Sequence, residues 1–285
     1  MKHHHFTPLH EANTTPIHVA QWAQALPLLH ARIAPYFARP EPRRRALAYL
    51  QGLLSPVERK NGWSLAEHAR EATPYGMQRL LVGSVWDADL VGDDLRSYVV
   101  EQLGDPEAVL AIDETSFPKS GDKSAGVQVQ YCGTTGQVEN CQVGVFLSYV
   151  TKAGHTLIDR ELYLPLSWTK DRKRCQAAGI PDASQFQTKC ELAVQMLERV
   201  SSAQIPFSWA VADSVYGSNL DLRNWLEQHL RSYVLAIACD EPVGIRDASG
   251  QRRQVEVREV EALLLAAQDW QQHSMSEGTR VPQAV

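Results

Sequence analysis

The sequence predicts an α+β protein, in which a helical N-terminal region precedes a mixed β-sheet with flanking helices. Apolar residues recur with helical spacing from Val19 to about Leu103, and short apolar strands alternating with helices begin near Glu107. A chain of 285 residues with 44% hydrophobic and 21% charged residues has the composition of a soluble globular protein. This composition excludes disordered, collagen-like and fibrous chains, and no apolar run approaches the roughly 18 residues of a membrane span.

The N-terminal region is expected to be a bundle of four or five short helices. Two apolar series follow three- and four-residue spacing: Trp22, Leu26, Leu29 and Ile33, then Leu47, Leu50, Leu53 and Leu54. The prolines that interrupt this pattern are Pro35, Pro40, Pro42, Pro56 and Pro74. Ser64 and Glu67 have the spacing of a capping box, which predicts a helix start at Ser64.

The rest of the chain predicts strands and helices in a definite order. Apolar or alternating stretches indicate strands at residues 109–112, 127–131, 142–150, 157–164, 209–212 and 232–239. Helices are expected after Ser184, where Gln187 completes a capping box, after Gly217, and over a last amphipathic segment that carries Val257 and Val260. Three antiparallel strands followed by alternating helix and strand form a mixed sheet. This is the element order of the RNase H-like fold, although other α/β folds accommodate it too.

Charge is unevenly distributed along the chain. Overall, 28 Lys and Arg face 33 Asp and Glu, a formal net charge of −5, whereas residues 1–80 carry ten basic against five acidic side chains. A basic N-terminal region on an acidic chain suits contact with nucleic acid, although proteins that never bind DNA share this balance. We predict a flexible tail over 1–18, a helical DNA-binding domain over 19–105 and an RNase H-like core over 106–285.

Cysteine usage and the N-terminus indicate a cytoplasmic protein. The five cysteines are Cys132, Cys141, Cys175, Cys190 and Cys239, and none of them forms a C-x-x-C pair. This spacing favours reduced, mostly buried thiols over a disulfide framework or a zinc site. The first ten residues have no apolar stretch after their basic residue, so they do not form a secretory signal.

Two aspartates stand out because each directly follows a strongly apolar strand. Asp113 follows residues 109–112 and Asp213 follows residues 209–212. The carboxyl ends of such strands meet at the sheet rim where ligands bind. Neighbouring carboxylates repel each other unless a cation or a shared proton intervenes, and Mg²⁺ prefers carboxylate oxygens with water and phosphate. The alternative is that each aspartate only caps the turn that follows it.

Several blocks of sequence, in order, resemble bacterial insertion-sequence transposases of the DDE superfamily. The first catalytic block is matched by Asp113-Glu114-Thr115-x-Phe117-x-Lys119-x-Gly121-x-Lys123-Ser124-x-Gly126, followed by Gln130-Tyr131-x-Gly133. The middle block is matched by Tyr163-Leu164-Pro165-x-x-Trp168 with Asp171-Arg172, and the second catalytic block by Ala212-Asp213-Ser214-x-Tyr216-Gly217. The upstream helical region is matched by Gly52-Leu53-Leu54-Ser55, Glu58-Arg59-Lys60-Asn61 and Trp86-Asp87. The resemblance extends from about residue 30 to about residue 279.

The resemblance implies an RNase H-like catalytic core in which Asp113 and Asp213 are the first two metal-binding carboxylates. It implies Mg²⁺ or Mn²⁺ as the cofactor, and metal-dependent cleavage and strand transfer at transposon ends as the activity. The expected partner is double-stranded DNA, both the terminal repeats of the transposon and the target, and a homo-oligomer is a compatible assembly. No membrane partner is expected.

Transposases of this family use a third carboxylate, a Glu on a helix beyond the final core strand. Residues 280–285 differ from the family's continuation, and Glu256, Glu259 and Glu261 follow the last core strand too closely to supply that Glu. We therefore expect a C-terminally truncated core with weak cleavage, and an inactive DNA-binding remnant is the alternative function. A glycosidase fits the paired acids but neither the Lys-rich loop nor the basic helices.

Six side chains are candidates for DNA contacts. They are Lys119, Lys123, Arg43, Arg44, Arg45 and Tyr216. The two lysines would contact phosphates near the metal ions, the arginines would lie on the DNA backbone, and Tyr216 would stack on a base or sugar. Each has a structural alternative: ordinary loop lysines, a solvated helix face, and an aromatic ring packed at a strand end.

Overall fold

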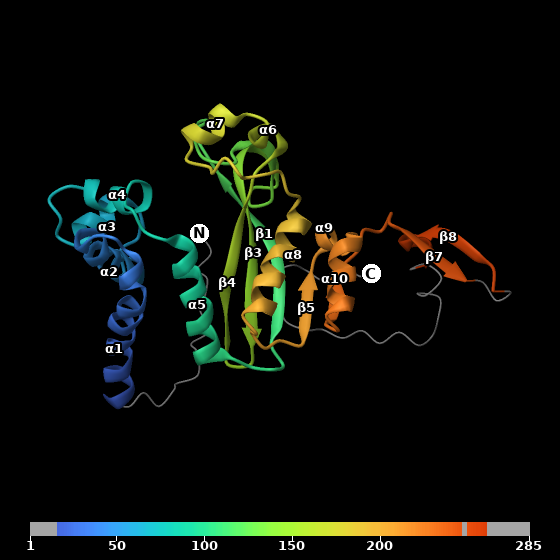
Figure 1. Ribbon diagram of the computed structural model, residues 1–285, viewed down its shortest axis with the longest axis horizontal. Coiled ribbons are helices and arrows are strands. Elements are labelled where there is room, and N and C mark those ends of the chain that lie inside the picture. Colours follow the sequence, from blue (N-terminus) through green and yellow to red (C-terminus); the bar gives the residue numbers. More distant parts are fainter. Residues whose placement is uncertain (1–15, 247–249, 261–285) are drawn as a thin grey trace, which may run out of the picture. The chain divides into compact units, whose positions relative to one another are not determined.

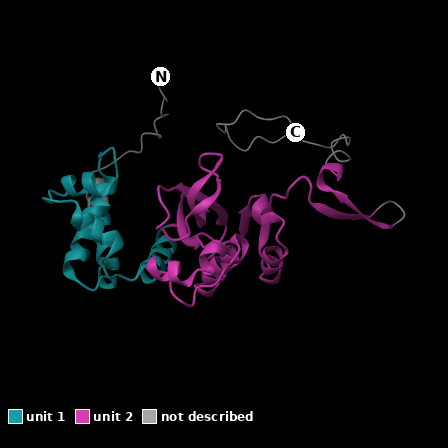
Figure 2. Ribbon diagram, turned by 90° about the horizontal axis from the view of Figure 1, so that it is seen from above, with its two compact units in different colours: residues 1–102 teal, residues 103–285 magenta. Residues whose placement is uncertain are grey.

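The computed structural model describes residues 16–246 and 250–260. The chain divides into two compact units, residues 1–102 and residues 103–285 (Figure 2). Most of the predicted tail over 1–18 lies outside the described residues, and residues 16–18 begin the first helix. Within the described residues, no helix combines the length and the apolar character that crossing a membrane requires.

Unit 1 is helical, as its periodicity predicts. Its elements are α1 (Pro16–Ile33), the 3-10 turn η1 (Ala34–Tyr36), α2 (Pro40–Leu54), α3 (Gly62–His68), α4 (Tyr75–Val82) and α5 (Ala88–Leu103) (Figure 1). The predicted capping box at Ser64 is wrong. Helix α3 begins earlier, because the Asn61 side chain accepts hydrogen bonds of 3.0 Å from the backbone N–H groups of Trp63 and Ser64.

Two small apolar clusters form the core around α2, α3 and α4. The first contains Phe37, Ala46 and Leu80, and the second contains Leu65, Ala66 and Met77. Leu80 and Met77 both belong to α4, one in each cluster. Their burial therefore determines which face of α4 is turned inward.

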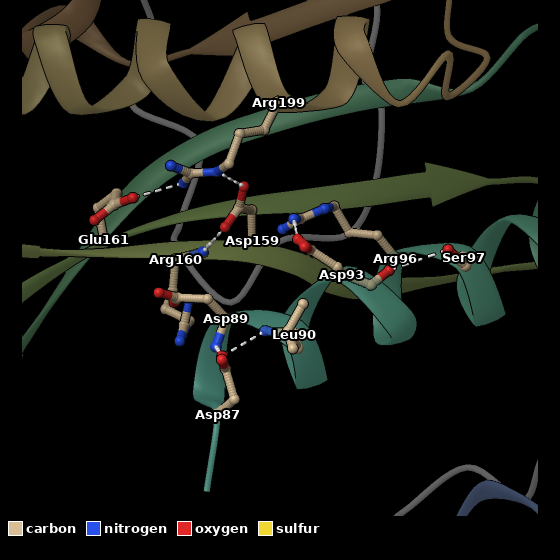
Figure 3. A network of polar contacts seen from close by, with 10 residues as sticks. All are labelled: Asp87, Asp89, Leu90, Asp93, Arg96, Ser97, Asp159, Arg160, Glu161 and Arg199. Atoms are coloured by element: carbon tan, nitrogen blue, oxygen red, sulfur yellow. Dashed lines mark hydrogen bonds and ion pairs between the residues drawn. The ribbon is translucent and has the colours of Figure 1, made fainter. Parts of the chain in front are cut away.

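Helix α5 has polar contacts of its own, some of them drawn in Figure 3. The Asp87 side chain accepts a hydrogen bond of 2.9 Å from the backbone N–H of Leu90 at the start of the helix, and Arg96 pairs with Asp93 one turn further on. Arg32 of α1 pairs with Asp94 of α5 at 2.7 Å, which links the first and last helices of unit 1.

Unit 2 is built on a mixed sheet. Its strands are β1 (Val109–Pro118), β2 (Gln128–Cys132), β3 (Gln137–Thr151), β4 (Gly154–Tyr163), β5 (Trp209–Ala212) and β6 (Ser232–Leu235). The order is β2-β3-β1-β5-β6, with β4 also paired to β3. Strands β1, β3 and β4 are antiparallel neighbours, whereas β5 runs parallel to β1 and β6 runs parallel to β5. This arrangement confirms the predicted RNase H-like order of a mixed α+β sheet.

Helices α8 (Lys189–Ser202), α9 (Ser214–Gly217) and α10 (Leu220–Gln228) complete this core. Helix α8 packs on β3 and β4, and α10 packs against α8 and β6. The buried face of α8 consists of Cys190, Leu192, Ala193, Met196, Leu197 and Val200. The capping box that opens α8 is formed by Thr188 and Glu191, and not by the predicted Ser184 and Gln187.

Arg199 fastens α8 to the sheet (Figure 3). Its Nε donates to Asp159 Oδ2 at 2.8 Å, and its second guanidinium arm pairs with Glu161 Oε1 at 2.6 Å. Both acids belong to β4, and the Asp159 side chain is buried. A buried carboxylate needs such a partner, because an unpaired charge there is strongly destabilising.

A small lobe packs at the far end of β1. We call residues 119–127, together with α6 (Leu166–Thr169) and α7 (Arg172–Ala177), the Trp168 lobe. Trp168 is fully buried, and its indole Nε1 donates to the Val127 carbonyl at 2.8 Å. The guanidinium of Arg174 lies 3.8 Å from the centre of the Trp168 ring, a cation–π contact. The middle sequence block therefore builds a packed lobe.

The last described segment differs from the sequence prediction. Strand β6 ends at Leu235, and a two-stranded hairpin follows, formed by β7 (Pro242–Arg246) and β8 (Arg252–Glu256). The hairpin was missed because its alternation is short, with Val243, Ile245 and Val255 as the less exposed positions. Residues 257–260 are helical, and the rest of the predicted last helix lies outside the described residues.

The five cysteines are free thiols. Four are buried, and Cys239 is exposed. Burial of four of the five thiols agrees with the prediction that they are mostly structural.

Candidate active site

Asp113 and Asp213 occupy neighbouring backbone positions in the sheet. The parallel ladder between β1 and β5 ends at the pair Ile112 and Ala212, and each aspartate is the next residue along the chain. Adjacent strands lie about 4.8 Å apart, so the two carboxylates start from neighbouring points of one sheet. The sequence prediction placed Asp113 at the end of a strand, which is wrong. Strand β1 continues to Pro118 because β3 still pairs with it, and only the parallel partner stops at this point.

Each aspartate uses one carboxylate oxygen locally. Asp113 Oδ1 accepts a hydrogen bond of 2.8 Å from the N–H of Glu114, and Asp213 Oδ1 accepts one of 2.9 Å from the N–H of Val215. Asp213 is thereby the N-cap of α9, as the structural alternative proposes. Within the described part of the chain, the Oδ2 atoms of both aspartates accept no hydrogen bond. Capping therefore leaves one oxygen of each available to a ligand.

The surroundings of Asp113 disfavour its ionised form. Partial burial raises the pKa of Asp113 above its ordinary value, and the negative charges of Glu114 and Asp213 raise it further. The backbone hydrogen bond from Glu114 and the positive charge of Lys189 act in the opposite direction. A cation bound between the aspartates would relieve this repulsion.

Glu114 faces a different set of partners. Lys189 Nζ, in the first turn of α8, donates to Glu114 Oε1 at 2.6 Å, and the Tyr216 hydroxyl of α9 donates to Glu114 Oε2 at 2.8 Å. Burial, followed by this hydrogen bond, raises the pKa of Tyr216, so the hydroxyl stays protonated. These contacts tie α8 and α9 to β1 directly beside the aspartates.

This network overturns the predicted role of Tyr216. The ring is fully buried and its hydroxyl is bonded to Glu114, so no face remains on which a base or sugar could stack. Sequence reasoning also missed Glu114 and Lys189, which are 75 residues apart. The only sequence signal was strand alternation, which turns Glu114 to the face opposite that of Asp113.

Gly217 is the last residue of the second catalytic block, and the close packing around it requires a glycine. A Cβ atom at this position would lie 1.7 Å from the carbonyl oxygen of Ala236. The N–H of Ala236 in turn donates to the Ala212 carbonyl at 3.0 Å, directly before Asp213. Only glycine lets the backbone of α9 approach the end of β6 so closely.

The donor set at Asp113 and Asp213 fits a divalent cation. Hard cations such as Mg²⁺ and Mn²⁺ prefer carboxylate oxygens and complete their shell with water and phosphate. The two aspartates offer such oxygens, and both side chains are exposed to solvent. No group of three or more His, Cys, Asp or Glu residues suited to a metal occurs within residues 16–246 and 250–260. Asp113 and Asp213 are thus a candidate site of two carboxylates.

Of the other acidic candidates, the described Glu256 and Glu259 form no metal-binding group with the two aspartates. Glu256 is the last residue of strand β8 and pairs with Arg258 at 2.7 Å, so it does not lie on a helix as the sequence predicts. Glu259 is an exposed residue of the helical segment 257–260 that follows, and Glu261 is outside the described residues.

The two predicted lysines lie away from the aspartates. Lys119 follows Asp113 by six residues of mostly extended strand, roughly 20 Å along β1. Both Lys119 and Lys123 are exposed on the Trp168 lobe. The interpretation that they contact phosphates beside the metal is therefore wrong. Contact between these lysines and DNA at a distance from the metal remains a prediction.

The three arginines of α2 differ in their surroundings. Arg45 pairs with Glu71 at 2.7 Å, and Arg43 donates to the Phe37 carbonyl at 3.1 Å. Both side chains are half-buried and stabilise unit 1, whereas Arg44 is exposed. The structure thus corrects the prediction for Arg43 and Arg45, and Arg44 stays a predicted DNA contact.

A mixed sheet of this order, with two carboxylates side by side where the parallel ladder ends, defines an RNase H-like core. A family model described as DDE superfamily endonuclease matches residues 32–281, and the chain belongs to this superfamily. It is also similar to a probable transposase for insertion sequence element IS701 from Microchaete diplosiphon, with 29% identity over 203 residues. That match covers 70% of this chain and 50% of the relative, so the chain spans about half the relative's length. The resemblance read from the sequence blocks is confirmed.

Proposed function

We propose that this chain cleaves and joins DNA at the ends of an insertion sequence, using a divalent metal ion held by Asp113 and Asp213. The observation that carries the proposal is the register of β1 and β5, which brings two carboxylates to neighbouring positions. Membership of the DDE superfamily and the similarity to a probable transposase support it. Its partner is double-stranded DNA, in the bacterial cytoplasm, and a homo-oligomer would suit the need to hold two transposon ends.

Some residues of the chain would hold the metal ion, and others would position them. The free Oδ2 atoms of Asp113 and Asp213 would hold Mg²⁺ or Mn²⁺. When bound, such an ion would activate the oxygen of water or of a 3′ hydroxyl that attacks a phosphodiester, and would stabilise the leaving oxygen. Lys189, Glu114 and Tyr216 act as positioning residues, because their hydrogen bonds hold α8 and α9 against the strand that carries Asp113. Asp213 is positioned by its hydrogen bond to the N–H of Val215.

The test is cleavage of a supercoiled plasmid that carries the DNA flanking this gene, with Mg²⁺ or Mn²⁺. We expect weak metal-dependent nicking by the unaltered chain and none above background in Asp113→Asn and Asp213→Asn, because each removes a carboxylate that holds the metal. Glu198→Gln is the matched control, since Glu198 is exposed on α8 away from the site. It should cleave as fast as the unaltered chain.

Two outcomes would contradict the proposal. Cleavage that persists in both Asp variants would show that other residues supply the chemistry. DNA binding without metal-dependent cleavage in any variant would favour a DNA-binding remnant instead.

A further inference from the structure

We infer that the exposed face of helix α4 reads base edges of duplex DNA, through Tyr75, Gln78, Arg79 and Val82. The inference rests on the proposed function, because it assumes that the chain binds DNA. It goes further by naming the element and the side chains that would distinguish one DNA sequence from another.

The spacing of these residues places them on one side of α4. They stand at positions i, i+3, i+4 and i+7 of an eight-residue helix, and together with Gly83 they line a hollow on the surface of unit 1. The opposite side of α4 is buried through Met77 and Leu80. The outward face is therefore set by the core and is not an arbitrary choice of surface.

This face exposes apolar and aromatic groups that a solvated helix would not need. Tyr75 is 67% exposed and Val82 is 89% exposed. Trp63, in the first turn of the neighbouring helix α3, is 63% exposed. Single exposed apolar residues are ordinary, but Tyr75 and Val82 line the same hollow, and such a grouping marks an interaction surface.

The polar members of the face have the chemistry that recognises bases. Arg binds the O6 and N7 atoms of guanine with two hydrogen bonds, Gln binds adenine in the same way, and an apolar side chain contacts the thymine methyl. Within the described part of the chain, Arg79 forms no ion pair and the Gln78 amide makes no hydrogen bond. Both groups are exposed and available.

Charge favours nucleic acid over protein as the occupant. Helix α4 contains no acidic residue. Residues 39–82, which span α2 to α4, carry eight Lys and Arg against four Asp and Glu. A net positive segment is attracted to the phosphate backbone, which brings a helix to the duplex before any base is read.

Local packing holds α4 and Gln78 in place. The Arg45–Glu71 ion pair lies against Gly76, where an added Cβ would be 2.4 Å from Arg45 Nε. The Gln78 stem lies against Gly62 of α3, where an added Cβ would be 2.9 Å from Gln78 Cγ. A side chain held before binding loses less conformational freedom when it meets its partner. Arg45 therefore supports the reading face without touching DNA itself.

The experiment selects preferred duplexes for the full chain from random-sequence DNA, then measures the affinity of variants for the selected duplex and for a scrambled one. Arg79→Ala should lower the preference for the selected duplex roughly 5- to 150-fold, since one good bidentate contact contributes about 1–3 kcal/mol. Gln78→Ala should lower it similarly at a different base pair. Affinity for the scrambled duplex should change far less.

Arg79→Lys separates base reading from charge. Lysine keeps the positive charge but lacks the planar fork of arginine, so affinity for the scrambled duplex should remain while the preference falls. Arg59→Ala is the matched control, because Arg59 is exposed in unit 1 outside α4, and it should keep the preference. Circular dichroism should show that all variants stay folded, since Gln78 and Arg79 are exposed.

Several results would overturn the inference. If Arg79→Ala and Gln78→Ala select the same sequence with the same affinity as Arg59→Ala, α4 does not read bases. A change in self-association by sedimentation, with base preference intact, would make the face a protein-docking surface. If the unaltered chain binds duplex DNA but selects no sequence, the inference fails while the proposed function stands. If the unaltered chain binds no DNA, the proposed function itself fails.

Discussion

Two parts of the first catalytic block, Asp113 within β1 and the loop that follows Pro118, differ in how their polar groups are satisfied. At Asp113 the parallel partner strand has ended, and the Oδ2 atoms of Asp113 and Asp213 accept no hydrogen bond from the described residues. In the loop after Pro118, the Asn140 amide donates to the carbonyls of Lys119 and Gly121, both at 2.8 Å, and Val127 accepts a hydrogen bond from the buried Trp168 indole.

This difference distinguishes residues suited to metal binding from residues that stabilise the fold. Exposed carboxylates that repel each other and keep a free oxygen suit a metal ion, whereas hydrogen-bonded carbonyls and a buried tryptophan suit a rigid scaffold. Both parts belong to the first catalytic block in the sequence. A match to such a block therefore does not identify all of its residues as functional.

The largest change in the free energy of unfolding is expected in the Trp168 lobe. Trp168→Ala should lower the free energy of unfolding by about 3–5 kcal/mol, because it removes a fully buried indole and its hydrogen bond to Val127. Urea denaturation measures this change. Trp63→Ala is the control, since Trp63 is largely exposed and should change stability by less than about 0.5 kcal/mol. Equal effects of the two substitutions would remove the distinction between lobe and surface.

Gly217→Ala should lower the free energy of unfolding by about 2–3 kcal/mol. The new Cβ would meet the Ala236 carbonyl at 1.7 Å, so α9 or the end of β6 must shift, and overpacking of this kind is destabilising. Gly133→Ala is the control, because a Cβ there meets nothing closer than 4.0 Å. A Gly217→Ala protein as stable as the Gly133→Ala protein would show that the close approach is not required.

Tyr216→Phe should lower the free energy of unfolding by about 1–2 kcal/mol. It removes the hydroxyl that donates to Glu114 and leaves Lys189 as the remaining partner of that carboxylate. Thermal denaturation and DNA affinity should be measured together. Loss of DNA affinity without loss of stability would restore the interpretation that Tyr216 contacts DNA.

Asp113→Asn should give the smallest change in stability, and in the opposite direction. The raised pKa of Asp113 means that the folded chain binds a proton more readily than the unfolded chain, so the free energy of unfolding falls as pH rises through that pKa. With a chelator present, the variant should be the more stable protein at pH 7.5, and the difference should shrink as pH falls towards the ordinary aspartate value. A variant less stable than the unaltered chain at pH 7.5 would show that the negative charge of Asp113 does not destabilise the folded chain.

The sequence predicted the fold well where periodicity is strong. The helices of unit 1, the order of the core strands and strand β5 at 209–212 all follow from apolar spacing. It was less informative where distant contacts decide the outcome. Strand β1 extends past Asp113 because β3 continues to pair with it. Helix α3 starts at Gly62 because Asn61, and not Ser64, is its N-cap.

The candidate site was predicted only in part, for the same reason. Asp113 and Asp213 were found because each follows an apolar strand, a local signal. The roles of Glu114, Lys189 and Tyr216 depend on hydrogen bonds between residues at least 75 positions apart, which no spacing reveals. The location of Lys119 was misjudged because the length of β1 was underestimated.

Calorimetric titration of Mn²⁺ into the full chain tests most directly whether Asp113 and Asp213 form a metal site. We expect Asp113→Asn and Asp213→Asn each to weaken Mn²⁺ binding by at least about tenfold, while Glu198→Gln binds as the unaltered chain does. Trp168-lobe residues should not matter, so Asp122→Asn, a change of an exposed acid on that lobe, should also leave the affinity unchanged. Mn²⁺ affinity that is equal in the unaltered chain and in both Asp113→Asn and Asp213→Asn would contradict the assignment of the two aspartates as the metal-binding pair.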